Sequence, residues 1–395
     1  MIRALPILFI LMLISVSCLA ADLQFCAGQT SCAGKNPRIK HIQILQQNGV
    51  RARWSPDGSL LVFDRKNSNG YFQVYRMTAA GQDVRGLTEN RDGLPQRSNG
   101  NAIFHPSGKW VVFVSEENHH FMDNARWTGD PGIGLFSNLW ATDLEGSQFW
   151  PLTHIPVKQT MGDGIPTYAT VNPLFSDDGH WLVWTERFAN GRKGSWRLWR
   201  LKIAEFVLDN GHPTLKNEKV LFASKKGNFV TAMGFLSPTE LVLAGNLDGQ
   251  HEYGMDQYVY NLTTHQVKNL TQTPEYWEEG SSVTPDHKII YMSNIDSIYH
   301  FDTSNPSGIK QAMTREYYVM DADGGHKERL TYFNDVSASE SVGKRVQAVA
   351  CDVSPDGRYL AATLGVDEET GSERVALQLK IVRIEFDPPF TVMKP

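Results

Sequence analysis

A short turn phrase recurs six times along this chain, and an apolar run follows each copy. Its fullest form is Ser-Pro-Asp-Gly, at residues 55–58 and again at 354–357. Proline and glycine beside aspartate form a tight turn, and a β-rich apolar run after such a turn is typical of a buried strand. Six copies of this unit predict six copies of one supersecondary element. The copies begin at Ser55, His105, Ser176, Ser237, Thr284 and Ser354.

Alignment of the repeats predicts four strands in each unit. In the first unit these strands end at Trp54 and then cover residues 60–64, 72–77 and 84–88. Four antiparallel strands repeated around an axis form a β-propeller, which protects most sheet edges. We therefore expect an all-β fold, a six-bladed β-propeller of four-stranded antiparallel blades.

The two ends of the chain are expected to meet in the last blade. Residues 387–389 read Asp-Pro-Pro, which breaks strands and leaves too little chain for a fourth strand in that unit. The run 39–45 is an additional strand before the first unit, so we expect it to complete the sixth blade and close the ring. An open solenoid is the alternative, and it would expose sheet edges.

The first 20 residues have the pattern of a secretory signal. Arg3 precedes an apolar stretch, and small residues follow with a cleavage site after Ala20. A membrane span is one alternative, although the stretch is shorter than the roughly 20 residues that a span needs. A lipid anchor on Cys18 is another. We expect an exported protein, periplasmic or extracellular, with no transmembrane span.

Cleavage of the signal removes Arg3 and changes the net charge from −5 to −6. No run of basic residues remains, which argues against a nucleic-acid partner. We expect a signal peptide at 1–20, an N-terminal segment at 21–38 and a single propeller domain at 39–395.

Three cysteines remain in the mature chain. Cys26 and Cys32 lie in a segment rich in glycine, alanine and serine, and we expect them to form a disulfide in an exported protein. So short a loop contributes about 2 kcal/mol or less. Cys351 lies in an apolar run and is expected to be a buried thiol.

The repeat resembles the propeller of the TolB-type family, and more widely the WD-type propellers. The resemblance rests on a turn, an apolar strand, an aromatic-rich strand, Asp-Gly and a basic-Leu-Thr end, and it covers nearly all of residues 39–385. TolB itself carries an α/β domain ahead of its propeller. Only about 18 residues separate the signal from the first strand here, so we expect no counterpart of that domain.

Unequal repeat spacing shows where extra residues lie. Long loops are expected at 116–136, 154–167, 294–314 and 332–345. Since strand direction alternates, all four emerge on one face, in pairs on opposite sides of the ring. A smaller expansion at 203–216 is expected on the other face. Binding residues in β scaffolds are usually on such loops, although insertions are also tolerated without a function.

Charged and aromatic residues of these loops are the expected binding face. On the first pair of loops they are His119, His120, Asp123, Arg126, Trp127, Asp130, His154, Asp163 and Tyr168; on the second pair they are Asp296, His300, Arg315, Lys344 and Arg345. Imidazole and carboxylate groups suit zinc, iron or manganese, so His119, His120 and Asp123 are candidate metal ligands. An ordinary polar surface is the alternative, and we expect no metal and no cofactor.

Catalytic signatures are mostly missing, including the Gly-x-Ser-x-Gly nucleophile elbow. We therefore expect a monomeric TolB-like scaffold that binds a protein, a peptide or a cell-envelope polysaccharide through its loop-rich face, without catalytic residues. The alternative is a secreted polysaccharide lyase or hydrolase, with or without metal assistance.

Overall fold

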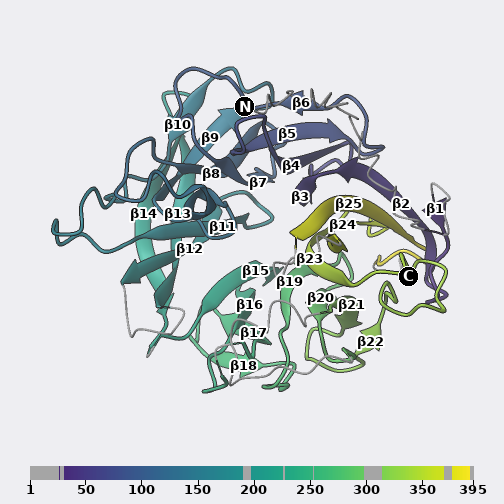
Figure 1. Cartoon of the computed structure of the whole chain (residues 1–395). Coiled ribbons are helices and arrows are strands. Elements are labelled where there is room, and N and C mark those ends of the chain that lie inside the picture. Colours follow the sequence, from purple (N-terminus) through teal and green to yellow (C-terminus); the bar gives the residue numbers. More distant parts are fainter. Residues whose placement is uncertain are drawn as a thin grey trace, which may run out of the picture.

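Six β-sheets surround a central axis in the computed structural model (Figure 1), which confirms the all-β, six-bladed propeller. The structure describes residue 26 and residues 31–189, 197–225, 227–251, 253–297, 314–368 and 376–391. The expected signal peptide at 1–20 lies outside these residues. No helix in the described part has the length and apolar character to cross a membrane.

Blades 1 to 5 each have four antiparallel strands, which run outward from the axis in chain order. Blades 1 to 3 comprise β3 (Gly49–Trp54), β4 (Leu60–Lys66), β5 (Phe72–Thr78) and β6 (Arg85–Gly86); β7 (Asn99–Phe104), β8 (Trp110–Glu116), β9 (Ser137–Asp143) and β10 (Phe149–Pro151); and β11 (Ala169–Phe175), β12 (Trp181–Ala189), β13 (Leu198–Asp209) and β14 (His212–Ala223). Blades 4 and 5 comprise β15 (Val230–Ser237), β16 (Glu240–Gly245), β17 (Asp256–Asn261) and β18 (Val267–Asn269); and β19 (Glu279–Val283), β20 (Ile289–Ser293), β21 (Glu316–Met320) and β22 (Glu328–Arg329).

Blade 6 joins the two ends of the chain, as the sequence predicted. Its inner strands are β23 (Val346–Val353), β24 (Tyr359–Glu368) and β25 (Ala376–Phe386), and β2 (Ile39–Gln47) pairs with β25. A short strand, β1 (Ser31–Cys32), extends this sheet by pairing with β2. The ring is therefore closed by the N-terminal strand, and Cys26 and Cys32 form the expected disulfide.

The recurring turn owes its composition to one set of hydrogen bonds. In blade 1 the Ser55 hydroxyl donates to the Asp57 carboxylate at 2.6 Å and accepts the Leu60 N–H at 2.9 Å. Gly58 has a φ of 71°, which glycine adopts without strain. The turn thus fixes the start of the next strand, and its hydroxyl and carboxylate recur at Ser176, Thr284 and Ser354.

The Leu-Thr end of the repeat ties the outermost strand to its neighbour. In blade 5 the Thr331 hydroxyl accepts the Tyr317 N–H at 2.9 Å and donates to the Glu316 carboxylate at 2.6 Å. Because one hydroxyl uses both its donor and its acceptor capacity, a very short outer strand is held firmly. The same pair of bonds recurs at Thr88, Thr153 and Thr271.

Every innermost strand carries a β-bulge, where the register with its neighbour shifts. Arg51, Asn101, Asn172 and Gly280 have a positive φ at this point, each four positions before the turn that ends its strand. Bulges re-aim side chains at the rims of such structures. They place polar groups of the inner strands near the central axis.

Candidate functional site: the loop-rich face

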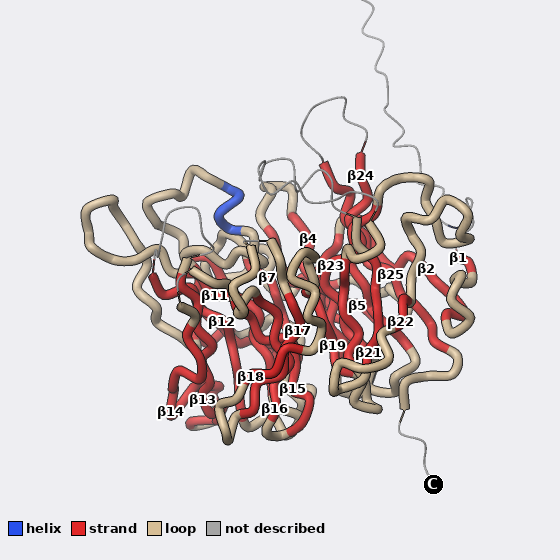
Figure 2. The backbone as a smooth tube through the Cα atoms, turned by 90° about the horizontal axis from the view of Figure 1, so that it is seen from below, coloured by secondary structure: helices blue, strands red, loops and turns tan. Residues whose placement is uncertain are grey.

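Long loops gather at one rim of the propeller, where the short 3-10 helix η2 (Arg126–Gly129) also lies, and the β13–β14 hairpin reaches the opposite rim (Figure 2). We call the loops the blade 2 loop (116–136), the blade 2–3 loop (154–167), the blade 5 loop (294–314, of which 294–297 and 314 are among the described residues) and the blade 5–6 loop (332–345). The extra residues at 203–216 lengthen strands β13 and β14 instead of forming a loop.

A buried carboxylate holds the base of the blade 2 loop. Glu116 is 1% exposed, and its oxygens accept Arg97 Nε at 2.8 Å and His120 Nε2 at 2.9 Å. His120 also accepts the Met122 N–H through Nδ1 and stacks on Phe136 at a centroid distance of 4.2 Å. His120, which was expected on the binding face, is therefore packed inside the loop and stabilises it.

Asp163 orders the blade 2–3 loop in a similar way. Its carboxylate accepts the N–H groups of Gln159, Thr160 and Ile165 and the ammonium of Lys158. These donors, led by the Thr160 N–H, lower the pKa of Asp163 well below its ordinary value. The two loops touch, because Phe121 N–H donates to the Lys158 carbonyl.

The tip of the blade 2 loop reaches the mouth of the central channel. Arg51 contacts Asp64 at 2.6 Å and Asp130 at 3.2 Å, and Asn101 donates to the Pro131 carbonyl at 3.3 Å. Burial by itself lowers the pKa of Arg51, but Asp130 and Asp64 outweigh burial and raise it. Asp130, expected to face a partner, is thus partly engaged by the propeller itself.

Several expected residues do remain available to a partner on this side. Trp127 is 60% exposed, Arg126 stacks over Tyr71, and His119 and His154 are exposed. Asp123 is half-buried. Tyr168 is half-buried and lines a pocket of about 200 Å³ with His154, Glu186, Arg200 and Lys202 among its other residues.

The candidate metal ligands do not come together. His120 uses both ring nitrogens within the loop, while His119 is exposed and Asp123 is half-buried. In the part of the chain that the structure describes, no group of three or more His, Cys, Asp or Glu side chains is placed to hold a metal ion. Cys351 is a buried free thiol, as expected.

The blade 5–6 loop lines a pocket of about 550 Å³ together with Asp296, Thr314 and Arg329, here called the blade 5–6 pocket. It contains three of the expected residues, Asp296, Lys344 and Arg345, and Arg315 adjoins it in the sequence beside Thr314. His300 lies outside the described residues. The full lining is Asp296, Thr314, Arg329, Asn334, Asp335, Val336, Ser341, Gly343, Lys344 and Arg345.

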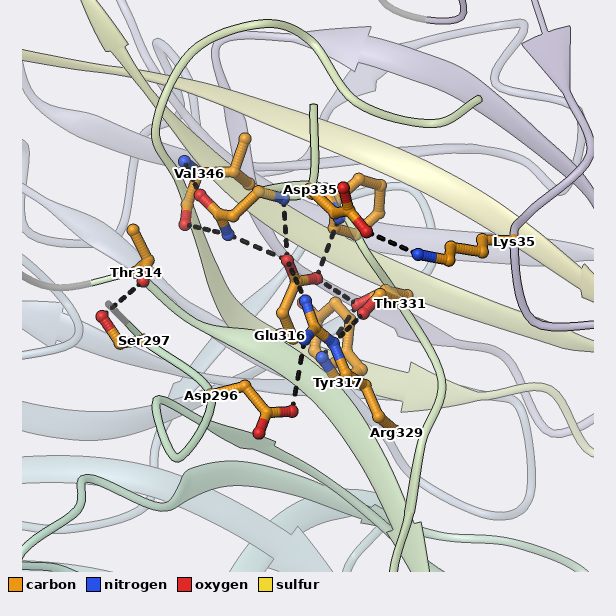
Figure 3. Close-up of polar contacts among 12 residues, drawn as sticks. Lys35, Asp296, Ser297, Thr314, Glu316, Tyr317, Arg329, Thr331, Asp335 and Val346 are labelled. Carbon is orange, nitrogen blue, oxygen red and sulfur yellow. Dashed lines mark hydrogen bonds and ion pairs between the residues drawn. The ribbon is translucent and has the colours of Figure 1, made fainter. Parts of the chain in front are cut away.

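Glu316 organises the floor of this pocket (Figure 3). Its carboxylate accepts the N–H groups of Phe333 and Asn334 and pairs with Arg329 at 3.3 Å, and Arg329 also contacts Asp296 at 3.2 Å. Burial raises the pKa of Glu316, and this effect outweighs the lowering by these donors. Arg329 therefore sits between two carboxylates.

Arg315 is directed along the ring rather than into the pocket. Its guanidinium donates to the Gln347 side chain at 2.8 Å and lies over the Trp277 ring. Burial lowers the pKa of Arg315 to about 10. Arg315 thus links blades 5 and 6 near the rim.

The N-terminal segment supports the same pocket from outside. Lys35 pairs with Asp335 at 2.5 Å, as Figure 3 shows, and its N–H donates to both Glu340 oxygens at 3.1 and 3.0 Å. The Ser339 hydroxyl donates to the Ala33 carbonyl. Residues next to the disulfide therefore hold the blade 5–6 loop.

Sequence reasoning missed Arg51, Lys35 and the anchoring role of Glu340. A signal for Arg51 was present, since Asn101 and Asn172 stand at its position in the next two repeats and asparagine favours a positive φ. No signal links Lys35 to Glu340, because their contact depends on where two loops 305 positions apart finally lie.

Comparisons with known proteins show no family for this chain. No family model matches the chain. YidR, an uncharacterized protein of Escherichia coli K12, is 25% identical over 134 residues, which are 34% of this chain and 25% of YidR. The chain therefore matches only a quarter of that relative's length.

Several solved structures match at low identity. TolB from Acinetobacter baumannii has 14% identity and a TM-score of 0.45, over 84% of this chain and 66% of TolB. An oligogalacturonate lyase from Vibrio parahaemolyticus has 12% identity and a TM-score of 0.46, over 90% of this chain and 96% of the lyase. TolB structures are thus among the matches, and the six blades themselves establish a six-bladed β-propeller.

Proposed function

We propose that the protein is an exported β-propeller that binds a protein partner or a cell-envelope polymer across its loop-rich face. The observation that carries this proposal is the placement of exposed apolar side chains. Eight large apolar side chains are well exposed in the described part of the chain, and five of them lie on the four loops: Trp127, Ile133, Met161, Ile295 and Val336.

Single exposed apolar residues need no explanation, but a concentration on one face marks an interaction surface. Trp127, Met161 and Val336 are 60%, 79% and 87% exposed, although each belongs to a loop whose base is fixed by buried polar groups. A rigid base spares a partner the entropic cost of ordering the loop. Export is supported by the signal-like N-terminus and by the Cys26–Cys32 disulfide.

The test is capture of partners from cell-envelope extract by the immobilised protein. One variant combines Trp127→Ala, Met161→Ser and Val336→Ser, and the control combines Leu208→Ser and Val220→Ser, which are exposed apolar residues of β13 and β14. We expect the first variant to lose the captured material and the control to keep it. Equal capture by both variants would overturn the proposal.

Protease treatment of the extract separates the two classes of partner. A protein partner disappears from the captured fraction, whereas a polysaccharide remains. Melting curves of all variants establish that the propeller is intact, since exposed substitutions of this kind usually change stability by about 0.5 kcal/mol or less.

A further inference from the structure

The blade 5–6 pocket has the size of a ligand site and a mixed set of charges. Its volume of about 550 Å³ lies within the range of pockets that bind small molecules or chain ends. Arg329, Lys344 and Arg345 supply three cations, and Asp296 and Asp335 supply two carboxylates. Which of these groups are already satisfied decides what the pocket can bind.

Nearly every charge in the pocket has a partner within the protein. Arg329 contacts Asp296 and Glu316, Arg345 pairs with Asp367, and Asp335 pairs with Lys35.

Lys344 is the exception: it is half-buried, and no hydrogen bond or ion pair joins its ammonium to any residue in the described ranges. The pocket therefore carries one cation that no carboxylate of the described residues contacts.

The surroundings of Lys344 favour a chain end with an apolar side chain. Gly343, with a φ of 67°, leaves open space where a side chain would stand, and Ser341 offers a hydroxyl. Val336 lines the same pocket and is 87% exposed, so it provides an apolar contact.

We propose that the blade 5–6 pocket binds the C-terminal carboxylate of a peptide chain, with Lys344 as the partner of the carboxylate and Val336 against the last side chain. Capture of a terminal carboxylate is an established mode of peptide recognition. The proposal deepens the binding role above and rests on it, because the pocket would be one subsite of the loop-rich face.

The experiment compares two probes that differ only at the carboxylate. Acetyl-Gly-Gly-Val and its C-terminal amide are titrated into the full protein, and binding is followed by calorimetry or by amide NMR shifts. We expect the free acid to bind about tenfold more tightly than the amide, which is the ratio that one charge-assisted hydrogen bond supplies.

The Lys344→Gln variant should bind the free-acid peptide only as tightly as it binds the amide. The matched control, Lys109→Gln, removes an exposed lysine from the turn that follows β7 on the opposite face and should change nothing. Equal binding of acid and amide, or an unchanged affinity in Lys344→Gln, would overturn the proposal.

A third probe, galacturonic acid, carries the same carboxylate on a sugar ring. If it binds more tightly than the peptide and depends on Lys344, the pocket serves a sugar acid and the peptide assignment is wrong. The two proposals fail separately: loss of envelope capture in the Trp127, Met161 and Val336 variant together with no tripeptide binding rejects only the pocket assignment.

Discussion

The blade 2 loop and the blade 5–6 loop stand on the same face, but they are held by contacts of very different sequence separation. Glu116 takes its donors from Arg97 and His120, which are 19 and 4 positions away. Glu340 and Asp335 take theirs from Lys35, which is 305 and 300 positions away. The base of the blade 2 loop is thus fixed by groups close to it in the sequence, whereas the contacts of Glu340 and Asp335 with Lys35 form only once the ring has closed.

The difference shows that loops on one face of a propeller can be held either by contacts close in sequence or by contacts distant in sequence. Contacts that are close in sequence form with little loss of chain entropy, so the base of the blade 2 loop can be fixed within its own blade, although its tip also contacts Arg51 of blade 1. The start of the blade 5–6 loop is held by Glu316, but its contacts with Lys35 require that β1 and β2 have joined blade 6. The N-terminal segment is thus a support of the blade 5–6 pocket as well as a closing strand.

The largest effect is expected from Glu116→Ala. The substitution leaves Arg97 and His120 without their buried partner, and breaking a buried pair in this way costs about 3–5 kcal/mol of unfolding free energy. Chemical unfolding measures the loss, and hydrogen exchange should show the blade 2 loop opening while the blade 5–6 loop is unchanged.

The control is Glu117→Ala, because Glu117 accepts only one hydrogen bond in the described structure, from the neutral side chain of Asn138. We expect a cost of about 1 kcal/mol there. Similar losses in the two variants would contradict the anchoring role of Glu116.

A smaller effect is expected from Glu340→Gln. The carboxylate is fully buried and both its oxygens accept the Lys35 N–H, whereas an amide presents one acceptor and an opposed donor. The expected loss is about 1–3 kcal/mol. Hydrogen exchange should accelerate at 332–345 and at 31–38 together, and remain unchanged at 116–136.

Glu328→Gln is the matched control. Glu328 is exposed and accepts one bond from the Asn36 side chain, a bond that an amide oxygen can also accept. Exchange that accelerates in the blade 5–6 loop but not in the N-terminal segment would show that the two do not act as one unit.

Sequence patterns predicted the elements that repeat and the contacts that are local. The turn at Ser55 and its five counterparts fixed the number of blades, and the strand-breaking residues 387–389 pointed to β2 as the closing strand. Such features depend on neighbours in the chain, so the residue types report them directly. The placement of the long loops on one face, as far as their residues are described, followed from strand direction alone.

The chemistry of the site was less accessible to sequence reasoning. His120 and Asp163 were expected on the surface because they belong to polar loops. His120 is instead buried against Phe136, whereas Asp163 is exposed but binds backbone N–H groups of its own loop. A loop sequence does not reveal which polar groups turn inward. The meeting of Lys35 with Asp335 depends on the closed ring, which no local pattern encodes.

The smallest expected effect is a change in carboxyl pKa, which distinguishes a carboxylate held by backbone N–H groups from one held by a distant lysine. The pKa of Asp163 is lowered chiefly by the Thr160 N–H, whereas the pKa of Asp335 is lowered chiefly by the Lys35 ammonium. Lys158→Met should therefore leave the pKa of Asp163 low, while Lys35→Met should raise the pKa of Asp335 toward its ordinary value. Carboxyl-carbon NMR titrations measure both values.

The sign of the pH dependence follows from these directions. A carboxyl group whose pKa is lowered by folding stabilises the native loop above the ordinary aspartate pKa, and this contribution is lost as the pH falls toward the lowered value. In Lys35→Met the pKa values of Asp335 in the folded and unfolded states come closer together, so the acid sensitivity of the blade 5–6 loop should shrink. In Lys158→Met the blade 2–3 loop should keep most of its acid sensitivity. If instead Lys158→Met shifted Asp163 as far as Lys35→Met shifts Asp335, side-chain charge would hold both loops, and the contrast between a local backbone anchor and a distant one would be wrong.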